Sequence, residues 1–289
     1  MTAAARAFAA LHRRGQPFVL PNAWDVACAL LLAEAGFAAI GTTSLGVTAA
    51  AGLVDGAGTG RAYTLALAAA IVPRVQVPVT IDTEGGYSDE PSAVAELAAE
   101  LASLGAAGIN LEDAAAGGRL RAPRLQADIV RAVVAAAPDL FVNARTDTYW
   151  LQAGPPESRL EETITRLKTY EDAGASGVFV PGLWEPEAVA AVTERVALPL
   201  NLLWRPDLDL AQLAAAGVAR ISTGSAPYRR ALAAGLATVI AARDGVEPAG
   251  PDVAYDRLLA LLKSGQQASW PAVKAVGEPA AQSTPLSRA

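Results

Sequence analysis

The sequence predicts a (β/α)8 TIM barrel, an α/β fold, followed by a C-terminal helical extension. Short β-forming apolar runs alternate with Ala/Leu-rich helical patterns along the chain, and eight such runs can be counted. The length of 289 residues suits one barrel, which typically needs about 250 residues, plus an extension. We therefore expect a barrel over residues 1–250, and over 251–289 a helical extension that ends in a disordered tail after about Gly277.

The elements follow in a regular order. The predicted strands cover residues 18–20, 38–43, 77–82, 108–112, 140–145, 177–181, 198–203 and 220–224. A glycine stands just after a helical pattern in AEAGFAAI, ASLGAAGI, EDAGASGV and AAAGVARI, where a helix C-cap is expected. The segment from residue 226 is expected to supply the eighth helix. A doubly wound open sheet is the alternative, but no G-x-G-x-x-G turn follows the first strand.

Composition disfavours several classes of partner. The net charge is −6 and acidic and basic residues are interleaved, so no nucleic-acid partner is expected. Residues 35–54 carry no charge but contain four Gly, three Thr and one Ser, which favours a strand and a loop over a membrane span. The single cysteine excludes an internal disulfide and favours the cytoplasm.

Charged side chains gather at the C-terminal ends of three predicted strands. Asp82 and Glu84 end one strand, Glu112 ends the next, and Arg145 ends the one after. Side chains alternate along a strand, so Asp82 and Glu84 are expected to share a face, directed to the mouth of the barrel where active sites lie. Three carboxylates in one mouth need a balancing cation. Oxygen donors without His or Cys favour Mg²⁺, with Mn²⁺ as a possibility.

Five motifs together resemble the isocitrate lyase / phosphoenolpyruvate mutase superfamily. They are PNAWD (21–25), TTSLGVTAAAGLVDG (42–56), TIDTEGGY (80–87), GINLEDA (108–114) and NARTD (143–147), and the resemblance extends over residues 12–225. It implies an α/β barrel and a homo-oligomer, a dimer or tetramer, that often exchanges the eighth helix between subunits. It also implies Mg²⁺ and a small carboxylate substrate whose C–C or P–C bond is made or broken.

The resemblance also implies roles for individual residues. Asp82 matches the principal metal carboxylate, and Asp55, Glu84 and Glu112 match further carboxylates of the metal shell. Arg145 and Glu112 are the expected catalytic residues. The expected substrate-binding residues are Thr43, Ser44, Leu45, Gly46, Arg145 and Asn201, the first four lying on a loop whose N–H groups and hydroxyl hold a carboxylate.

One motif of the lyase branch is missing. The Lys-Lys-Cys-Gly-His loop is replaced by AAAGGRLRAPRLQ (114–126). Its arginines Arg119, Arg121 and Arg124 could close over an anionic group or form a solvated face. The only cysteine, Cys28, and the only histidine, His12, are expected to be structural.

Three functions are compatible with the sequence. The first is a Mg²⁺-dependent lyase that cleaves a C–C bond, or decarboxylates, in a 2-oxo or 2-hydroxy di- or tricarboxylic acid through a metal-stabilised enolate. The second is a P–C bond enzyme similar to phosphoenolpyruvate mutase or phosphonopyruvate hydrolase. The third is a catalytically silent metal-binding barrel.

Overall fold

The barrel is closed by parallel strands. The computed structural model describes residues 2–115 and 117–265. The main sheet has the order β1-β11-β10-β9-β8-β5-β4-β3-β2, and every pairing in it is parallel. Its strands are β1 (Phe18–Leu20), β2 (Asn22–Ala23), β3 (Ile40–Thr42), β4 (Val79–Asp82), β5 (Gly108–Glu112), β8 (Phe141–Arg145), β9 (Gly177–Phe179), β10 (Leu200–Leu203) and β11 (Arg220–Ser222).

The first barrel strand is divided in two at Pro21. β1 pairs with β11 and β2 pairs with β3, so this strand closes the ring between the two ends of the sheet. Proline has no N–H to donate, but its carbonyl still accepts a hydrogen bond of 2.8 Å from the N–H of Gly41. The nine strand segments are therefore the eight predicted barrel strands, and the predicted fold is confirmed.

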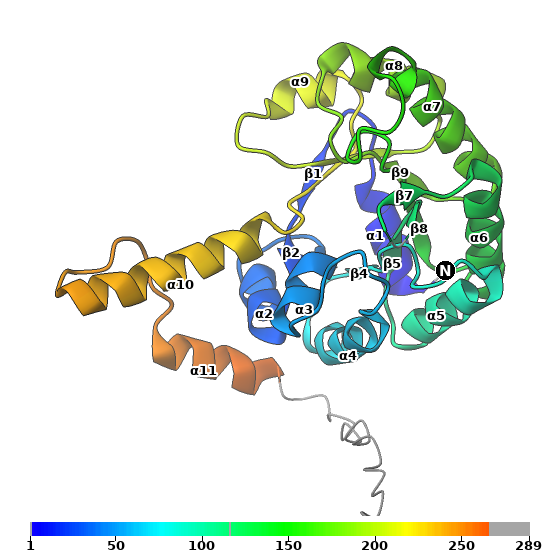
Figure 1. Cartoon of the computed structure of the whole chain (residues 1–289). Coiled ribbons are helices and arrows are strands. Elements are labelled where there is room, and N and C mark those ends of the chain that lie inside the picture. The colour runs from blue at the N-terminus through cyan, green and yellow to red at the C-terminus, as the bar shows by residue number, and fades with distance from the viewer. Residues whose placement is uncertain (1, 116, 266–289) are drawn as a thin grey trace, which may run out of the picture.

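Helices follow most strands and surround the barrel (Figure 1). Their bounds are α1 (Ala3–Leu11), α2 (Val26–Glu34), α3 (Ser44–Ala50), α4 (Arg61–Ile71) with the 3₁₀ turn η1 (Val72–Arg74), α5 (Pro91–Ser103), α6 (Pro123–Ala136), α7 (Pro156–Asp172), α8 (Pro186–Arg195), α9 (Leu210–Ala215), α10 (Ala226–Asp244) and α11 (Tyr255–Ser264). An antiparallel hairpin, β6 (Ala114–Ala115) and β7 (Arg119–Leu120), follows β5. No helix of the described residues is long and apolar enough to cross a membrane.

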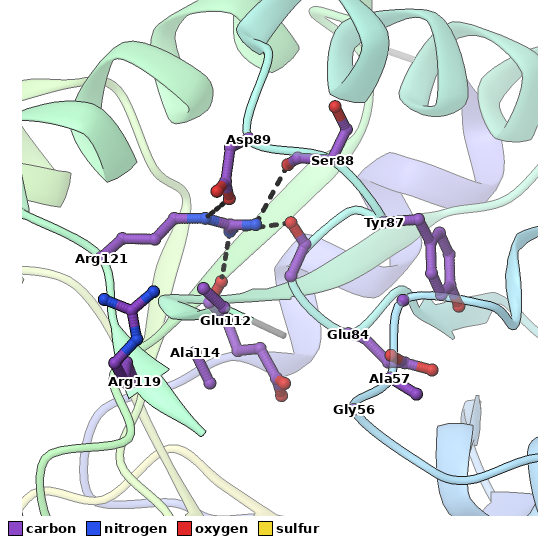
Figure 2. Close-up of a pocket in the computed structure, with 13 residues that line it drawn as sticks. Gly56, Ala57, Glu84, Tyr87, Ser88, Asp89, Glu112, Ala114, Arg119 and Arg121 are labelled. Carbon is purple, nitrogen blue, oxygen red and sulfur yellow. Dashed lines mark hydrogen bonds and ion pairs between the residues drawn. The ribbon is translucent and has the colours of Figure 1, made fainter. Parts of the chain in front are cut away.

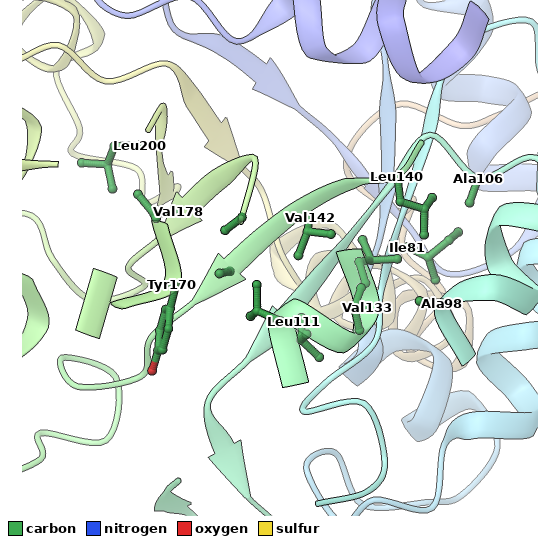
Figure 3. Close-up of a cluster of buried hydrophobic side chains, with 14 of the residues drawn as sticks. Ile81, Ala98, Ala106, Leu111, Val133, Leu140, Val142, Tyr170, Val178 and Leu200 are labelled. Carbon is green, nitrogen blue, oxygen red and sulfur yellow. The ribbon is translucent and has the colours of Figure 1, made fainter. Parts of the chain in front are cut away.

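The main core lies between the strands and the outer helices. Ile81, Leu111 and Val142 alternate with polar residues of their strands, and Val178 lies between Gly177 and Phe179. All four side chains are buried, as Figure 3 shows. Each side chain of this kind stabilises the fold by about 1.5–3 kcal/mol when it leaves water. Because these side chains point outward to the helices, the alternate positions on each strand face the barrel axis.

Helix α1 closes the end of the barrel opposite the mouth. Phe8 is fully buried there against Leu20 and Phe141. His12 stacks on Phe141 with the ring centroids 4.1 Å apart, and burial lowers its pKa to about 3. His12 is therefore a neutral packing residue at the bottom of the barrel.

The last two helices depart from the predicted arrangement. The segment after residue 226 does form a helix, but α10 projects away from the barrel (Figure 1) and only Tyr228 of it is buried. Instead α11 packs on α2, where the guanidinium of Arg257 lies 2.6 Å from the carboxylate of Glu34. The predicted tail after Gly277 lies outside the described residues.

Candidate active site

A small cavity lies at the C-terminal ends of the strands. It has a volume of about 100 Å³ and is lined by Asn22, Thr43, Ser44, Leu45, Asp55, Asp82, Asn110, Arg145, Trp150, Phe179, Pro181, Leu203, Ser222, Gly224 and Ser225. We call it the mouth cavity. Six of the predicted site residues line it: Thr43, Ser44, Leu45, Asp55, Asp82 and Arg145.

Asp82 is held in place by the neighbouring strand. Its N–H donates to the hydroxyl of Thr42 at 2.9 Å, and its carboxylate accepts from the N–H of Ser44 at 2.9 Å. One oxygen of the carboxylate is thereby oriented by β3 and α3, while the side chain still borders the cavity.

The segment predicted as a substrate-binding loop begins a helix. Thr43 is the N-cap of α3, whose first turn starts at Ser44. The first N–H groups of a helix have no partner within it, so Leu45 and Gly46 can offer donors to an anion. Gly46 does not line the mouth cavity, because it packs on Trp24: a Cβ at this position would lie 2.8 Å from that of Trp24.

A second cavity of about 260 Å³ adjoins the first and contains Glu84, Glu112, Arg119 and Arg121 among its lining residues (Figure 2). Glu84 comes after the end of β4 and has a φ of 49°, in the left-handed region. Strand alternation therefore does not extend to it, and the prediction that Asp82 and Glu84 share one strand face is wrong in detail: they border adjacent cavities.

Arg121 is a buried anchor between two loops, although the sequence suggested an arginine of a lid or a solvated face. Its guanidinium donates to the carbonyls of Gly85, Ser88 and Glu112 and to the carboxylate of Asp89 (Figure 2). Only 6% of the residue is exposed. It therefore fixes the loop that carries Glu84 against the strand end that carries Glu112. Arg119, on the same hairpin, is exposed.

Arg145 lies between two carboxylates. Its guanidinium is 2.9 Å from Glu112 and makes a forked contact with Asp147 at 2.5 and 3.0 Å. Burial alone would lower the pKa of Arg145, but Asp147 and Glu112 outweigh this and raise it, so the guanidinium stays charged. Burial raises the pKa of Glu112, and the nearby Arg145 opposes that shift. Asp147 was not among the predicted site residues, although it ends the NARTD motif (143–147).

The other two acids near the mouth, Asp55 and Glu84, have raised pKa values. Burial, with a contribution from Asp82, raises the pKa of Asp55, and a hydrogen bond from Ser44 partly offsets this. Burial and the charge of Asp55 raise the pKa of Glu84 to about 7. Oxygen Oε1 of Glu84 is buried and has no hydrogen-bond partner among the described residues. A positive ligand at this place would offset the repulsion between these acids.

The donor set fits a hydrated Mg²⁺ better than a metal enclosed by protein ligands. No group of three or more His, Cys, Asp or Glu within residues 2–115 and 117–265 is placed to hold a metal ion. Mg²⁺ usually keeps several waters and takes one or two carboxylates directly. Asp82 and Asp55 can supply these, and Glu84 and Glu112 can act through water.

Asn201 lies below the mouth cavity and does not line it. Its Oδ1 accepts a 3.1 Å hydrogen bond from Ser222, which does line the cavity. The expected substrate contact of Asn201 is thus indirect in this geometry. Trp150 and Phe179, by contrast, line the cavity. The sequence left open whether Trp150 lines the mouth or packs under a loop, and it contained no signal for Phe179.

Comparison with known proteins gives the site its context. The family model of phosphoenolpyruvate phosphomutase matches residues 8–242. The chain belongs to this family. An uncharacterized protein of Mycobacterium tuberculosis (strain H37Rv) is 46% identical over 252 residues, 87% of this chain and 94% of that protein. The family assignment confirms the predicted superfamily, whose members are lyases and mutases, and with it the prediction of an enzyme.

Relatives whose names state an activity are more distant. The 2-methylisocitrate lyase of Bacillus subtilis (strain 168) is 30% identical over 189 residues, 63% of this chain and 60% of that enzyme. The structure of oxaloacetate acetylhydrolase in complex with its product oxalate is 27% identical with a TM-score of 0.80, covering 92% of this chain and 95% of that one. A candidate phosphonomutase from Burkholderia cenocepacia J2315 is 40% identical with a TM-score of 0.78, over 83% and 99% of the two chains. By name, these relatives are a lyase, a hydrolase and a candidate phosphonomutase.

Proposed function

We propose that this protein is a Mg²⁺-dependent lyase that cleaves a C–C bond, or decarboxylates, in a short 2-oxo or 2-hydroxy dicarboxylic acid. The observation that carries the proposal is the content of the mouth cavity: Asp82 and Asp55 lie with Ser44 and the charged Arg145 in one small space. This combines oxygen donors for a metal with cationic and N–H donors for a carboxylate.

The size of the mouth cavity favours a short acid over a tricarboxylate. Its volume of about 100 Å³ is smaller than the 260 Å³ of the adjoining cavity. Among the relatives, oxaloacetate acetylhydrolase and oxaloacetate decarboxylase take their names from a four-carbon 2-oxo diacid, which supports the same choice here.

The residues have separable tasks in this reaction. Arg145, fixed by its fork to Asp147, would hold one substrate carboxylate in a charge-assisted contact, and Ser44 would hold it from the other side. Bound Mg²⁺ would supply Lewis-acid stabilisation of the negative charge that bond cleavage leaves on the carbonyl fragment. Asp82 and Asp55 would hold that ion. Cys28 lies on α2 and His12 at the bottom of the barrel, so neither donates a proton at the mouth.

The test is a substrate panel with and without Mg²⁺. Oxaloacetate, 2,3-dimethylmalate, isocitrate, 2-methylisocitrate and phosphonopyruvate would be supplied in turn, and pyruvate, glyoxylate and oxalate release followed, the first two by coupled NADH oxidation. Because oxaloacetate decarboxylates spontaneously with Mg²⁺, Asp82→Ala is the control for every substrate. Mg²⁺-dependent turnover of a C–C substrate that the variant loses supports the proposal.

Two other outcomes would replace it. Turnover of phosphonopyruvate alone would identify a P–C bond enzyme, a class that the candidate phosphonomutase from Burkholderia cenocepacia keeps open. No turnover of these five substrates, in protein that binds Mg²⁺ by calorimetry, would leave two alternatives: a substrate outside the panel, or a catalytically silent metal-binding protein.

We also propose that the protein forms a homo-oligomer through α10. Leu232, Leu236, Val239 and Ile240 lie on this projecting helix and are 41–67% exposed. Their spacing forms one apolar stripe, which a second copy could cover. Light scattering after size exclusion should give a multiple of 29.5 kDa, and Leu236→Glu should reduce it. A monomeric wild-type protein would contradict this proposal. A cytoplasmic location stays a prediction.

A further inference from the structure

A fully buried arginine lies at the barrel axis beneath the mouth cavity. Arg220, on β11, has no exposed surface. Within the described residues, no carboxylate lies within 4 Å of its guanidinium, which donates instead to Asn110 at 3.1 Å and to Ser222 at 3.0 Å. Its Nη1 has no partner in that part of the chain. A buried charge of this kind is costly and orients every polar group around it.

The contact with Arg220 decides the orientation of the Asn110 amide. Arginine can only donate hydrogen bonds, so the atom of Asn110 that faces it must be the oxygen. The same oxygen also accepts from Nδ2 of Asn143 at 2.8 Å. Both acceptor positions of the Asn110 oxygen are thus filled from inside the barrel, and the amide cannot flip without losing two hydrogen bonds.

The opposite end of the amide is left for the mouth cavity. Asn110 is 6% exposed and lines this cavity, and its Nδ2 has no partner among the described residues. In the sheet it stands directly beside Asp82. Two N–H donors therefore lie next to the carboxylate expected to hold the metal.

We propose that Asn110 is a substrate-binding residue, whose two amide N–H groups donate to an oxygen of the bound oxo acid. The proposal rests on the proposed function, because it needs an anionic substrate in the mouth cavity. A neutral donor suits this place: it binds a substrate oxygen without competing for the metal carboxylates beside it.

The experiment measures oxalate binding in the presence of Mg²⁺ by isothermal titration calorimetry, which needs no turnover. Asn110→Asp keeps an acceptor for Arg220 but removes both donors; Asn110→Ala removes the donors without adding a charge. We expect both variants to bind oxalate about 10- to 100-fold more weakly than the wild type, the range for losing hydrogen bonds to a charged group.

Thr80→Val is the matched control. Thr80 is a buried residue of β4, two positions before Asp82. Its hydroxyl has no partner among the described residues, and it does not line the mouth cavity. This variant should bind oxalate like the wild type. Thermal melts of all variants report whether the fold is retained, and Asn110→Asp should keep it because the carboxylate can pair with Arg220.

The outcomes separate the two proposals. Wild-type affinity in Asn110→Ala, with binding lost only in Asn110→Asp, would show charge repulsion and overturn the role of Asn110. Equal affinity in all proteins would overturn it as well, while leaving the proposed function standing. A wild-type protein that binds Mg²⁺ but not oxalate would refute the proposed site for an oxo acid, and the role of Asn110 with it.

Discussion

Glu112 and Asp113 are neighbours in the sequence but lie in opposite environments. Asp113 is completely buried between the strands and the outer helices. There its carboxylate accepts hydrogen bonds from Thr146, Arg166, Tyr170 and the N–H of Asp147. Glu112 faces the mouth, where its carboxylate has one guanidinium partner and borders a cavity. One peptide unit thus separates a structural carboxylate from a candidate catalytic one.

The difference is one of hydrogen-bond satisfaction rather than of burial. Both residues are less than 9% exposed, so burial alone would group them together. All the partners of Asp113 come from the chain, which leaves nothing for a ligand to do. Asp82 and Glu112 each have one such partner, the N–H of Ser44 and the guanidinium of Arg145, and Glu84 retains an unpaired buried oxygen. Unsatisfied acids beside a cavity are the better guide to function.

The largest expected effect is on activity, from Asp82→Asn. This change keeps the shape and an oxygen for the Ser44 N–H but removes the charge that would hold the metal. We expect the Mg²⁺-dependent rate to fall about 10³-fold, with the free energy of unfolding within about 1 kcal/mol of the wild type. Steady-state kinetics and urea unfolding measure the two quantities. An Asp82→Asn protein that is much less stable than the wild type yet keeps its turnover would show that Asp82 stabilises the fold and does not serve the reaction.

Asp113→Asn should show the opposite pattern. It replaces the acceptor of four donors by an amide that must donate to some of them, and it leaves Arg166 without its buried carboxylate. We expect a loss of about 3–5 kcal/mol in the free energy of unfolding, with near-normal turnover per folded molecule. Asp128→Asn, on the exposed face of α6, is the control and should change stability by less than about 0.5 kcal/mol. Stability equal to that of this control would count against the buried network.

Two arginines of one hairpin give a sharper version of the same comparison. Arg121→Met should lower the free energy of unfolding by about 1.5–3 kcal/mol, because the carbonyls of Gly85 and Ser88 and the Asp89 carboxylate lose this donor. Arg119→Met, on the exposed side of the hairpin, should cost less than about 0.5 kcal/mol. Hydrogen exchange should also become faster in residues 83–90 for the first variant alone; equal exchange in both would argue against an anchoring role.

The smallest effect concerns pH. The pKa of Glu84 is raised from its usual 4.5 to about 7, so the folded protein binds this proton more tightly than the unfolded chain. Stability without metal should therefore fall as the pH rises from about 4.5 to 7, by a Tm change of about 2–4 °C. Glu84→Gln should flatten this dependence in thermal melts. Added Mg²⁺ should raise the Tm more at pH 8 than at pH 5.5, since the metal needs the ionised carboxylate. A Glu84→Gln protein with the wild-type dependence would exclude Glu84 as its source.

Much of the site could be predicted from single strands. Alternation along β4, β5 and β8 correctly separated the axis-facing Asp82, Glu112 and Arg145 from the helix-facing Ile81 and its equivalents, because side chains on a strand point to two faces only. The method failed at Glu84, where the chain has left the strand and the backbone is left-handed. It also could not distinguish Arg121 from Arg119, since only the fold decides which of them meets the carbonyls of another loop.

The sequence by itself determined the alternation of strands and helices, the eight-stranded barrel and the end of it where the carboxylates gather, because these follow from local periodicity. The tertiary structure alone decided which charges are satisfied: the fork of Arg145 to Asp147, the anchor at Arg121, and the contact of Arg220 with Asn110, which are 110 residues apart. It also decided that α10 leaves the barrel. Partners of this kind are set by packing between distant segments, and no pattern within one segment encodes them.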